Sequence, residues 1–370
     1  MNAPAAHFPP VARRLAPEQY FDGILRSDRR VLSRFITLLE SSLVDDRRLA
    51  QHVLTSLLPH TGRSIRVGIT GVPGAGKSTL IESLGRMLTG KGHRVAVLTI
   101  DPTSRISGGS ILGDKTRMID LSRDPNAFIR PSPSGQTLGG VARNTREVML
   151  TCEAANFDIV LIETVGVGQS ETMVADMVDF FLVVLIAGAG DELQGIKRGL
   201  MEMADLVAIN KADGDNKVHA ERACALYQNA MRLICPVDSP WTPPVLTCSA
   251  IEKTGIDKLW SQVLKHRARL EPTGWFQQQR RAQMVRWMWD LVNERIDGLL
   301  HRTPEIRVIS TRVESEVRSG SMTAADGAET VLCAIGLGEL VPQRTALNGF
   351  CEGPRMENSS RADETARNSS

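Results

Sequence analysis

The chain has 370 residues, of which 42% are apolar and 23% are charged, as is usual for a folded globular protein. Its 44 basic residues nearly balance 42 acidic ones, and the net charge of +2 gives no electrostatic case for a nucleic acid or a membrane as the main partner. Six cysteines without C-x-x-C spacing, an N-terminus without a signal-peptide core and no apolar run of bilayer length together predict a reduced, cytoplasmic protein.

Residues 1–60 are predicted to form a helical extension. After a first dozen residues rich in Pro and Ala, the stretches VLSRFITLLESS and RRLAQHVLTSLL repeat apolar residues at three- and four-residue spacing. This spacing predicts two or three helices before the next domain.

Residues 61–270 alternate short apolar runs with helical stretches. The runs are IRVGIT, RVAVLTI, DIVLIET, DFFLVVLI, DLVAIN and PPVLTCS. Such alternation predicts an α/β fold in which a mostly parallel sheet is covered by helices on both faces. Ligands of such sheets bind at the carboxyl ends of the strands.

The stretch GVPGAGKS lies between the first of these runs and a helical stretch. Glycines let the backbone N–H groups converge on an anion, and the start of the helix adds further donors. The full G-x-x-x-x-G-K-[ST] pattern in this context predicts a P-loop NTPase whose lysine reaches the β and γ phosphates. The predicted nucleotide-binding residues here are Gly74, Ala75, Gly76, Lys77, Ser78 and Thr79.

The sequence Asn210-Lys211-Ala212-Asp213 follows a predicted strand and suits guanine. A carboxylate at Asp213 can accept hydrogen bonds from both N1–H and the 2-amino group of guanine, which adenine does not offer. Asn210 would hold N7 and the loop, and the Lys211 stem would cover the face of the base. After the last strand, a backbone N–H of Ser249 or Ala250 can meet guanine O6.

Carboxylates at the ends of other strands are candidates for Mg²⁺. DIVLIET delivers Glu163, and Gly166 after it can swing toward a γ-phosphate. In the same way RVAVLTI delivers Asp101, and the glycine-rich stretch after it delivers Asp114. Together with Ser78 these acids form the predicted metal site, and Lys77, Glu163 and Gly166 are the predicted catalytic residues.

The C-terminal part divides into a helical arm over residues 271–335 and a polar tail over 336–370, which is predicted to be disordered. The arm contains a long helix with one apolar stripe, which either docks on its own sheet or forms a dimer surface. A further helical pair, broken at Ser319-Gly320, is predicted to follow. The stripe consists of Met284, Trp287, Met288, Leu291, Val292, Ile296 and Leu299.

Four strings of this sequence carry a resemblance: DPTSRISGGSILGDKTRM, RPSPSGQTLGGVARNT, ETVGVGQSE and AGAGDELQGIKRGLMEMAD. They resemble a known family, the methylmalonyl-CoA mutase-associated GTPases, formerly described as arginine/ornithine transport kinases. The resemblance runs from Ile65 to Leu332.

The resemblance implies a homodimeric G-protein chaperone that uses GTP, GDP and Mg²⁺. Its implied partner is an adenosylcobalamin-dependent acyl-CoA mutase, whose cofactor loading it assists and which it protects from inactivation. In this family GDELQGIKRG is similar to a mobile segment that couples nucleotide state to the mutase. Asp191, Gln194 and Lys197 are therefore candidate coupling residues, as is Gln169.

The position after Gly166 predicts slow hydrolysis. Ras-like enzymes place a water-orienting glutamine there, whereas this chain has Val167, which cannot orient water. A partner that reorders residues 166–171 and 191–197 would then accelerate the reaction.

Two other functions are weighed against the chaperone. A metal-insertion GTPase would need a Cys/His cluster, and the cysteines and histidines show no ligand spacing. A small-molecule kinase acting on arginine or ornithine would need a general base beside an acceptor pocket, which the sequence does not locate.

Overall fold

The computed structural model describes residues 14–100, 118–131, 138–164, 170–188, 198–236 and 239–337. The predicted disordered tail lies outside the described residues from 338 onward. The chain forms two compact units, one up to Leu291 and one from Val292, and each is described by itself.

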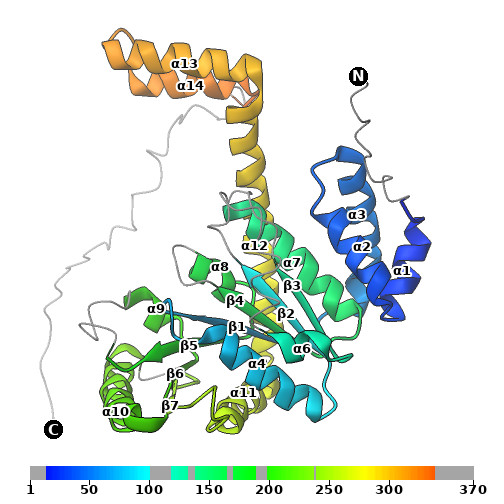
Figure 1. The fold of residues 1–370 in the computed structure, drawn as a ribbon. Helices are drawn as coiled ribbons and strands as arrows, with labels where there is room; N and C mark the ends of the chain where they lie inside the picture. The colour runs from blue at the N-terminus through cyan, green and yellow to red at the C-terminus, as the bar shows by residue number, and fades with distance from the viewer. Residues whose placement is uncertain are drawn as a thin grey trace, which may run out of the picture. The chain divides into compact units, whose positions relative to one another are not determined.

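In the described part of the first unit, seven strands form one sheet, and every pair of neighbours is parallel. The strand order is β3-β2-β4-β1-β5-β6-β7. The predicted α/β fold with a parallel sheet is thus confirmed (Figure 1). The strands are β1 (Ile65–Gly71), β2 (Val95–Ile100), β3 (Ala127–Pro131), β4 (Ile159–Thr164), β5 (Phe180–Ile186), β6 (Leu206–Asn210) and β7 (Val245–Thr247).

Both faces of the sheet are buried, which explains why the strands read as continuous apolar runs. Every residue of β4 is buried. Leu161 packs into one hydrophobic cluster and its neighbour Ile162 into the other, since successive side chains of a strand point to opposite faces. Strand β3 was not predicted, because its sequence AFIRP is short and ends in proline.

Helices cover the two faces of the sheet (Figure 1). One face carries α1 (Pro17–Leu25), α2 (Arg29–Leu39), α3 (Val44–Leu57), α7 (Leu138–Ala154), α8 (Ser170–Ala175), α9 (Arg198–Glu202) and α10 (Lys217–Ile234). The other face carries α4 (Lys77–Gly90), α6 (Ile119–Arg123) and α11 (Ile256–Leu270).

The N-terminal extension consists of α1, α2 and α3, as the sequence predicts. Asp28 caps α2 by accepting hydrogen bonds from the backbone N–H groups of Arg30 and Val31, at 2.8 and 3.2 Å. The extension packs on α7, where Gln51 donates a hydrogen bond of 2.7 Å to the buried Glu147.

The described part of the second unit is helical. It begins within α12 (Trp275–Arg302) and continues with α13 (Pro304–Ser319) and α14 (Ala324–Ala334). Gly320 ends α13 with φ of 77°, as the predicted break requires. Gly327 of α14 packs closely on α13, because a Cβ there would lie 2.9 Å from a methyl carbon of Val317. None of the helices that the structure describes has the length and apolar character needed to cross a membrane.

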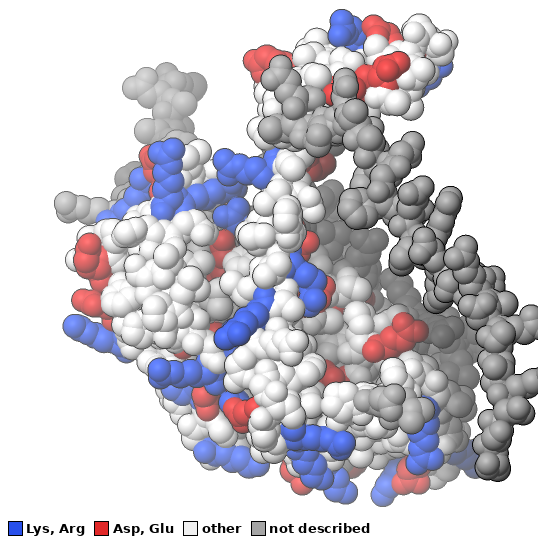
Figure 2. All heavy atoms as spheres, turned by 180° about the vertical axis from the view of Figure 1, so that it is seen from behind, with Lys and Arg blue, Asp and Glu red and all other residues white. Residues whose placement is uncertain are grey.

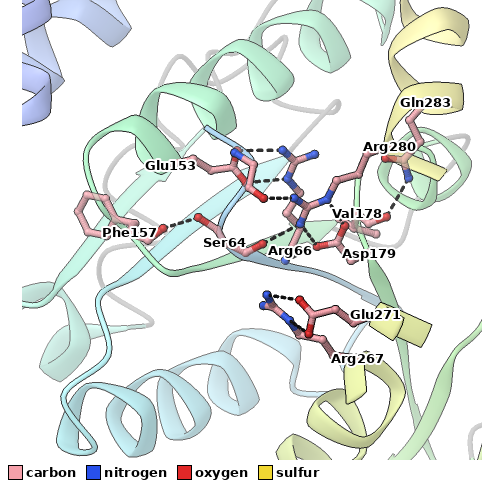
Figure 3. A network of polar contacts seen from close by, with 11 residues as sticks. Ser64, Arg66, Glu153, Phe157, Val178, Asp179, Arg267, Glu271, Arg280 and Gln283 are labelled. Carbon is pink, nitrogen blue, oxygen red and sulfur yellow. Dashed lines mark hydrogen bonds and ion pairs between the residues drawn. The ribbon is translucent and has the colours of Figure 1, made fainter. Parts of the chain in front are cut away.

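Arg280 fastens the first part of α12 to the amino-terminal end of the sheet (Figure 3). Its guanidinium makes two hydrogen bonds to the carboxylate of Asp179, at 2.7 and 2.6 Å. It also donates to the carbonyl oxygens of Gly62 and Ser64. Asp179 in turn accepts the backbone N–H of Arg66 at 3.0 Å. One side chain therefore joins α12 to the starts of β1 and β5.

Further polar contacts extend this attachment. Gln283 is buried and donates to the carbonyl of Val178 at 2.8 Å (Figure 3). Arg146 of α7 donates to the carbonyls of Gln283 and Asp176, each at 3.1 Å. The side chain of Trp287 packs against the core of the sheet. The inner side of α12 thus docks on its own domain, one of the two alternatives for this helix.

We predict that Arg280→Ala lowers the free energy of unfolding by about 3 kcal/mol, because it leaves the buried carboxylate of Asp179 without its counter-ion. The side chains of Arg280 and Asp179 are only 20% and 6% exposed. Denaturant unfolding followed by circular dichroism measures the change.

Arg286→Ala is the matched control on the same helix. Its ion pair with Asp176 spans 3.2 Å between side chains that are 54% and 50% exposed, so its loss is expected to cost less than about 1 kcal/mol. Equal losses in the two variants would contradict the role of Arg280.

Candidate nucleotide site

The predicted phosphate loop connects β1 to α4 in the first unit. Gly74 and Gly76 have φ of 78° and 83°, in the left-handed region that favours glycine. A Cβ at Gly76 would lie 2.7 Å from the amide nitrogen of Asn210. The backbone at this position therefore lies close to the side chain of Asn210 at the end of β6, and a side chain here would prevent this approach.

Lys77 opens α4 and is buried against its own loop. Its ammonium donates to the backbone carbonyl of Gly71 at 2.9 Å and to that of Val72 at 3.2 Å. The cation is thus held inside the loop at the start of the helix, where an anion is favoured by the helix dipole and by the N–H groups of the first turn.

Ser78 and Glu163, which the sequence assigned to one metal site, meet in the structure. The hydroxyl of Ser78 donates to Oε1 of Glu163 at 2.7 Å. Glu163 is buried near the end of β4, which pairs with β1. Hydroxyl and carboxylate oxygens are hard ligands of the kind that Mg²⁺ prefers, so this pair fits a magnesium site. Thr79 lies exposed on the first turn of α4.

Asn210 connects the two loops of the site through its amide. The nitrogen donates to the carbonyl of Ala75 at 2.7 Å, and the oxygen accepts the N–H of Ala250 at 3.1 Å. The thiol of Cys248 lies 3.6 Å from the same oxygen. Burial raises the pKa of Cys248 to about 12, so the thiol keeps its proton. Asn210 itself is buried, and its orientation is fixed by these contacts.

Asp213 is held by the side chain of Ser249, whose hydroxyl donates to Oδ2 of the carboxylate. The sequence assigned Ser249 to the base through its backbone and did not predict this contact between side chains. Lys211 is exposed and has φ of 58°, a left-handed conformation that directs the chain around the loop. The N–H of Ala250, one of the two groups predicted to meet guanine O6, donates to Asn210 in the structure.

Several predicted residues lie outside the described part of the chain, and their roles stay predictions. These are the metal-site candidates Asp101 and Asp114, the catalytic candidate Gly166 with Val167 beside it, and the coupling candidates Gln169, Asp191, Gln194 and Lys197.

Comparison with known proteins relates the chain to one family. The family model described as "Methylmalonyl Co-A mutase-associated GTPase MeaB" matches residues 32–305. A protein of Caulobacter vibrioides named as a GTPase is 54% identical over 314 residues, which cover 85% of this chain and 96% of that protein. The "Methylmalonic aciduria type A homolog, mitochondrial" of Mus musculus is 45% identical over 327 residues, covering 86% and 79%.

A solved structure of a "LAO/AO transport system kinase" has a similar fold. It superimposes with a TM-score of 0.71 at 36% sequence identity, covering 88% of this chain and 99% of that one.

We predict that Lys77→Ala weakens GTP binding by about 10- to 100-fold, because charge-assisted hydrogen bonds to phosphate are lost. Titration with a fluorescent GTP analogue measures the dissociation constant. Lys91→Ala removes the same charge just past the other end of α4 and should leave binding unchanged. If the two variants bind equally well, Lys77 does not contact the phosphates.

Proposed function

We propose that this chain, which belongs to the family of methylmalonyl-CoA mutase-associated GTPases, is a chaperone of an adenosylcobalamin-dependent acyl-CoA mutase. The protein is a GTPase and binds guanine nucleotide. The observation that carries the proposal is the family match over residues 32–305, which includes the whole sheet and both loops of the site. Its proposed location is the cytoplasm.

The proposed base site consists of Asn210, Asp213 and the loop that holds Ser249 and Ala250. Its support is that Asn210 is buried and that both ends of its amide are bound, so the protein's own contacts hold the loop in place. A contact of Ala250 N–H with guanine O6 would have to share this donor with Asn210. The hydroxyl of Ser249 aligns the carboxylate of Asp213 for N1–H and the 2-amino group.

Ser78 and Glu163 are the described residues that would hold Mg²⁺, with Asp101 and Asp114 as further candidates from the sequence. The ion would supply positive charge that neutralises the phosphates. Lys77 binds the same phosphates from inside the loop, and the loop glycines turn backbone donors toward them.

Intrinsic hydrolysis is proposed to be slow, because Val167 occupies the position of a water-orienting side chain. The mutase is proposed to accelerate it. Residues 166–171 and 191–197 would change with nucleotide state, and the mutase would bind one state better than the other. Gln169, Asp191, Gln194 and Lys197 are proposed to make this connection.

A homodimer is proposed through the outer side of α12. Met284, Val285, Met288 and Trp289 are 42–57% exposed there, although Gln283 and Trp287 of the same helix face the core. On the face that Figure 2 shows, basic and acidic side chains are scattered among uncharged ones. The exposed apolar side chains of α12 favour association with a second copy, because association would remove them from water.

We predict that Asp213→Asn exchanges guanine for xanthine. The Asn amide can accept N1–H and at the same time donate to the 2-oxo group of xanthine, whereas with guanine its NH2 group would face the 2-amino donor. GTP should bind about 10²- to 10⁴-fold more weakly and XTP more tightly than in the unmodified protein, as competition titration measures. Asp215→Asn changes an exposed acid of the same turn and should retain the preference for GTP.

The proposal is tested by phosphate release from GTP and from ATP, with and without an adenosylcobalamin-dependent mutase. GTP turnover should be slow alone, rise with the mutase and vanish in Lys77→Ala. Because one solved relative is called a kinase, arginine and ornithine are added in parallel. A phosphorylated amino acid formed in amounts equal to the nucleotide consumed would replace the chaperone proposal with a kinase.

A further inference from the structure

Ser83 is a buried polar residue of α4, six positions after Lys77. Its hydroxyl donates to the backbone carbonyl of Ala250 at 2.6 Å, although the two residues are 167 positions apart. A helix rises about 1.5 Å per residue, so this contact lies about 9 Å along α4 from the lysine. It ties the helix that begins at the phosphate loop to the loop that follows β7.

The same Ala250 is held from its other side by Asn210. The amide of Asn210 accepts the N–H of Ala250 at 3.1 Å and donates to the carbonyl of Ala75 at 2.7 Å. Since Ala75 belongs to the phosphate loop, a ring of hydrogen bonds runs from this loop through Asn210 and Ala250 to Ser83 and back along α4. Ala250 is only 4% exposed, so its carbonyl has little access to water.

The neighbouring residue, Ser249, carries the contact to Asp213. Its hydroxyl donates to the Asp213 carboxylate and accepts the N–H of Glu252 at 3.1 Å. Its backbone pairs with Thr254 through two hydrogen bonds of 3.0 and 3.1 Å. The loop is therefore braced as one piece, and a displacement of the Ala250 peptide displaces Ser249 as well.

We infer that Ser83 is a positioning residue for base selection: by holding the Ala250 carbonyl, it keeps Ser249 and Asp213 aligned for guanine. Without the hydroxyl, the carbonyl becomes a buried acceptor that has lost its donor, and the peptide moves to find another. The phosphate contacts precede Ser83 on the chain and do not use its side chain. Loss of the hydroxyl thus weakens recognition of the base and spares recognition of the phosphates. The inference rests on the proposed role of Asp213 in the base site.

The experiment compares GDP and ADP as competitors of a fluorescent GDP analogue. Ser83→Ala should weaken GDP about five- to tenfold, the effect of one net hydrogen bond, and change ADP by less than about twofold. The ratio of the ADP to the GDP dissociation constant therefore falls about fivefold, toward one. Ser83→Thr retains a hydroxyl donor and should restore the ratio.

Thr89→Val is the matched control on α4. Its hydroxyl is also buried but donates within the helix, to the carbonyl of Arg86 at 3.3 Å. This variant should leave the ratio unchanged, even if its thermal midpoint falls.

A Ser83→Ala variant that loses stability but keeps the full GDP to ADP ratio would overturn the inference, since Ser83 would then support only the fold. If Ser83→Ala does not fold, Ser83→Cys takes its place, because a thiol is a weaker donor of similar size. Its ratio of the ADP to the GDP dissociation constant should lie between one and the ratio of Ser83→Thr. An unchanged ratio overturns the inference. A different result, in which the unmodified protein itself binds GDP and ADP equally, would refute the base site rather than the role of Ser83.

Discussion

The amide of Asn210 is the contact on which the geometry of the candidate site depends. It is buried, and it bonds to the phosphate loop at Ala75 with one end and to the last loop of the site at Ala250 with the other. These two loops are about 175 residues apart in the sequence and have no local reason to adopt matching positions. Because an unpaired buried amide is costly, both loops are constrained to the arrangement that satisfies Asn210.

The parallel sheet gives this arrangement its direction. Strand β1 ends at the phosphate loop, and the start of the same strand lies beside the residues that fasten α12. Parallel strands place all carboxyl ends at one edge, so Glu163, Asn210 and the phosphate loop gather there. Asp179, which binds Arg280, lies at the opposite edge. The candidate site and the attachment of α12 through Arg280 therefore lie at opposite ends of one sheet.

Sequence patterns predicted local features well and contacts between distant residues poorly. The phosphate loop, the strands buried on both faces and the break at Gly320 are each encoded in a few consecutive residues. The sequence does not predict strand β3, because five residues with a terminal proline give too weak a strand signal. The sequence leaves the docking of α12 open, since an apolar stripe looks the same on a helix that packs on a core and on one at a subunit interface. The exposed Met288 and the packed Trp287 lie next to each other in sequence.

By itself the sequence determined the fold class and the pattern of the phosphate loop, and it placed Ser78 and Glu163 in the same part of the sheet, because each depends on a residue type at a fixed place relative to a strand or helix. Only the tertiary structure decided that Ser249 holds Asp213, that Ser83 holds Ala250 and that Arg280 joins α12 to β1 and β5. A serine hydroxyl or an arginine has many available partners, and its choice depends on which donors and acceptors the packed chain leaves within about 3 Å.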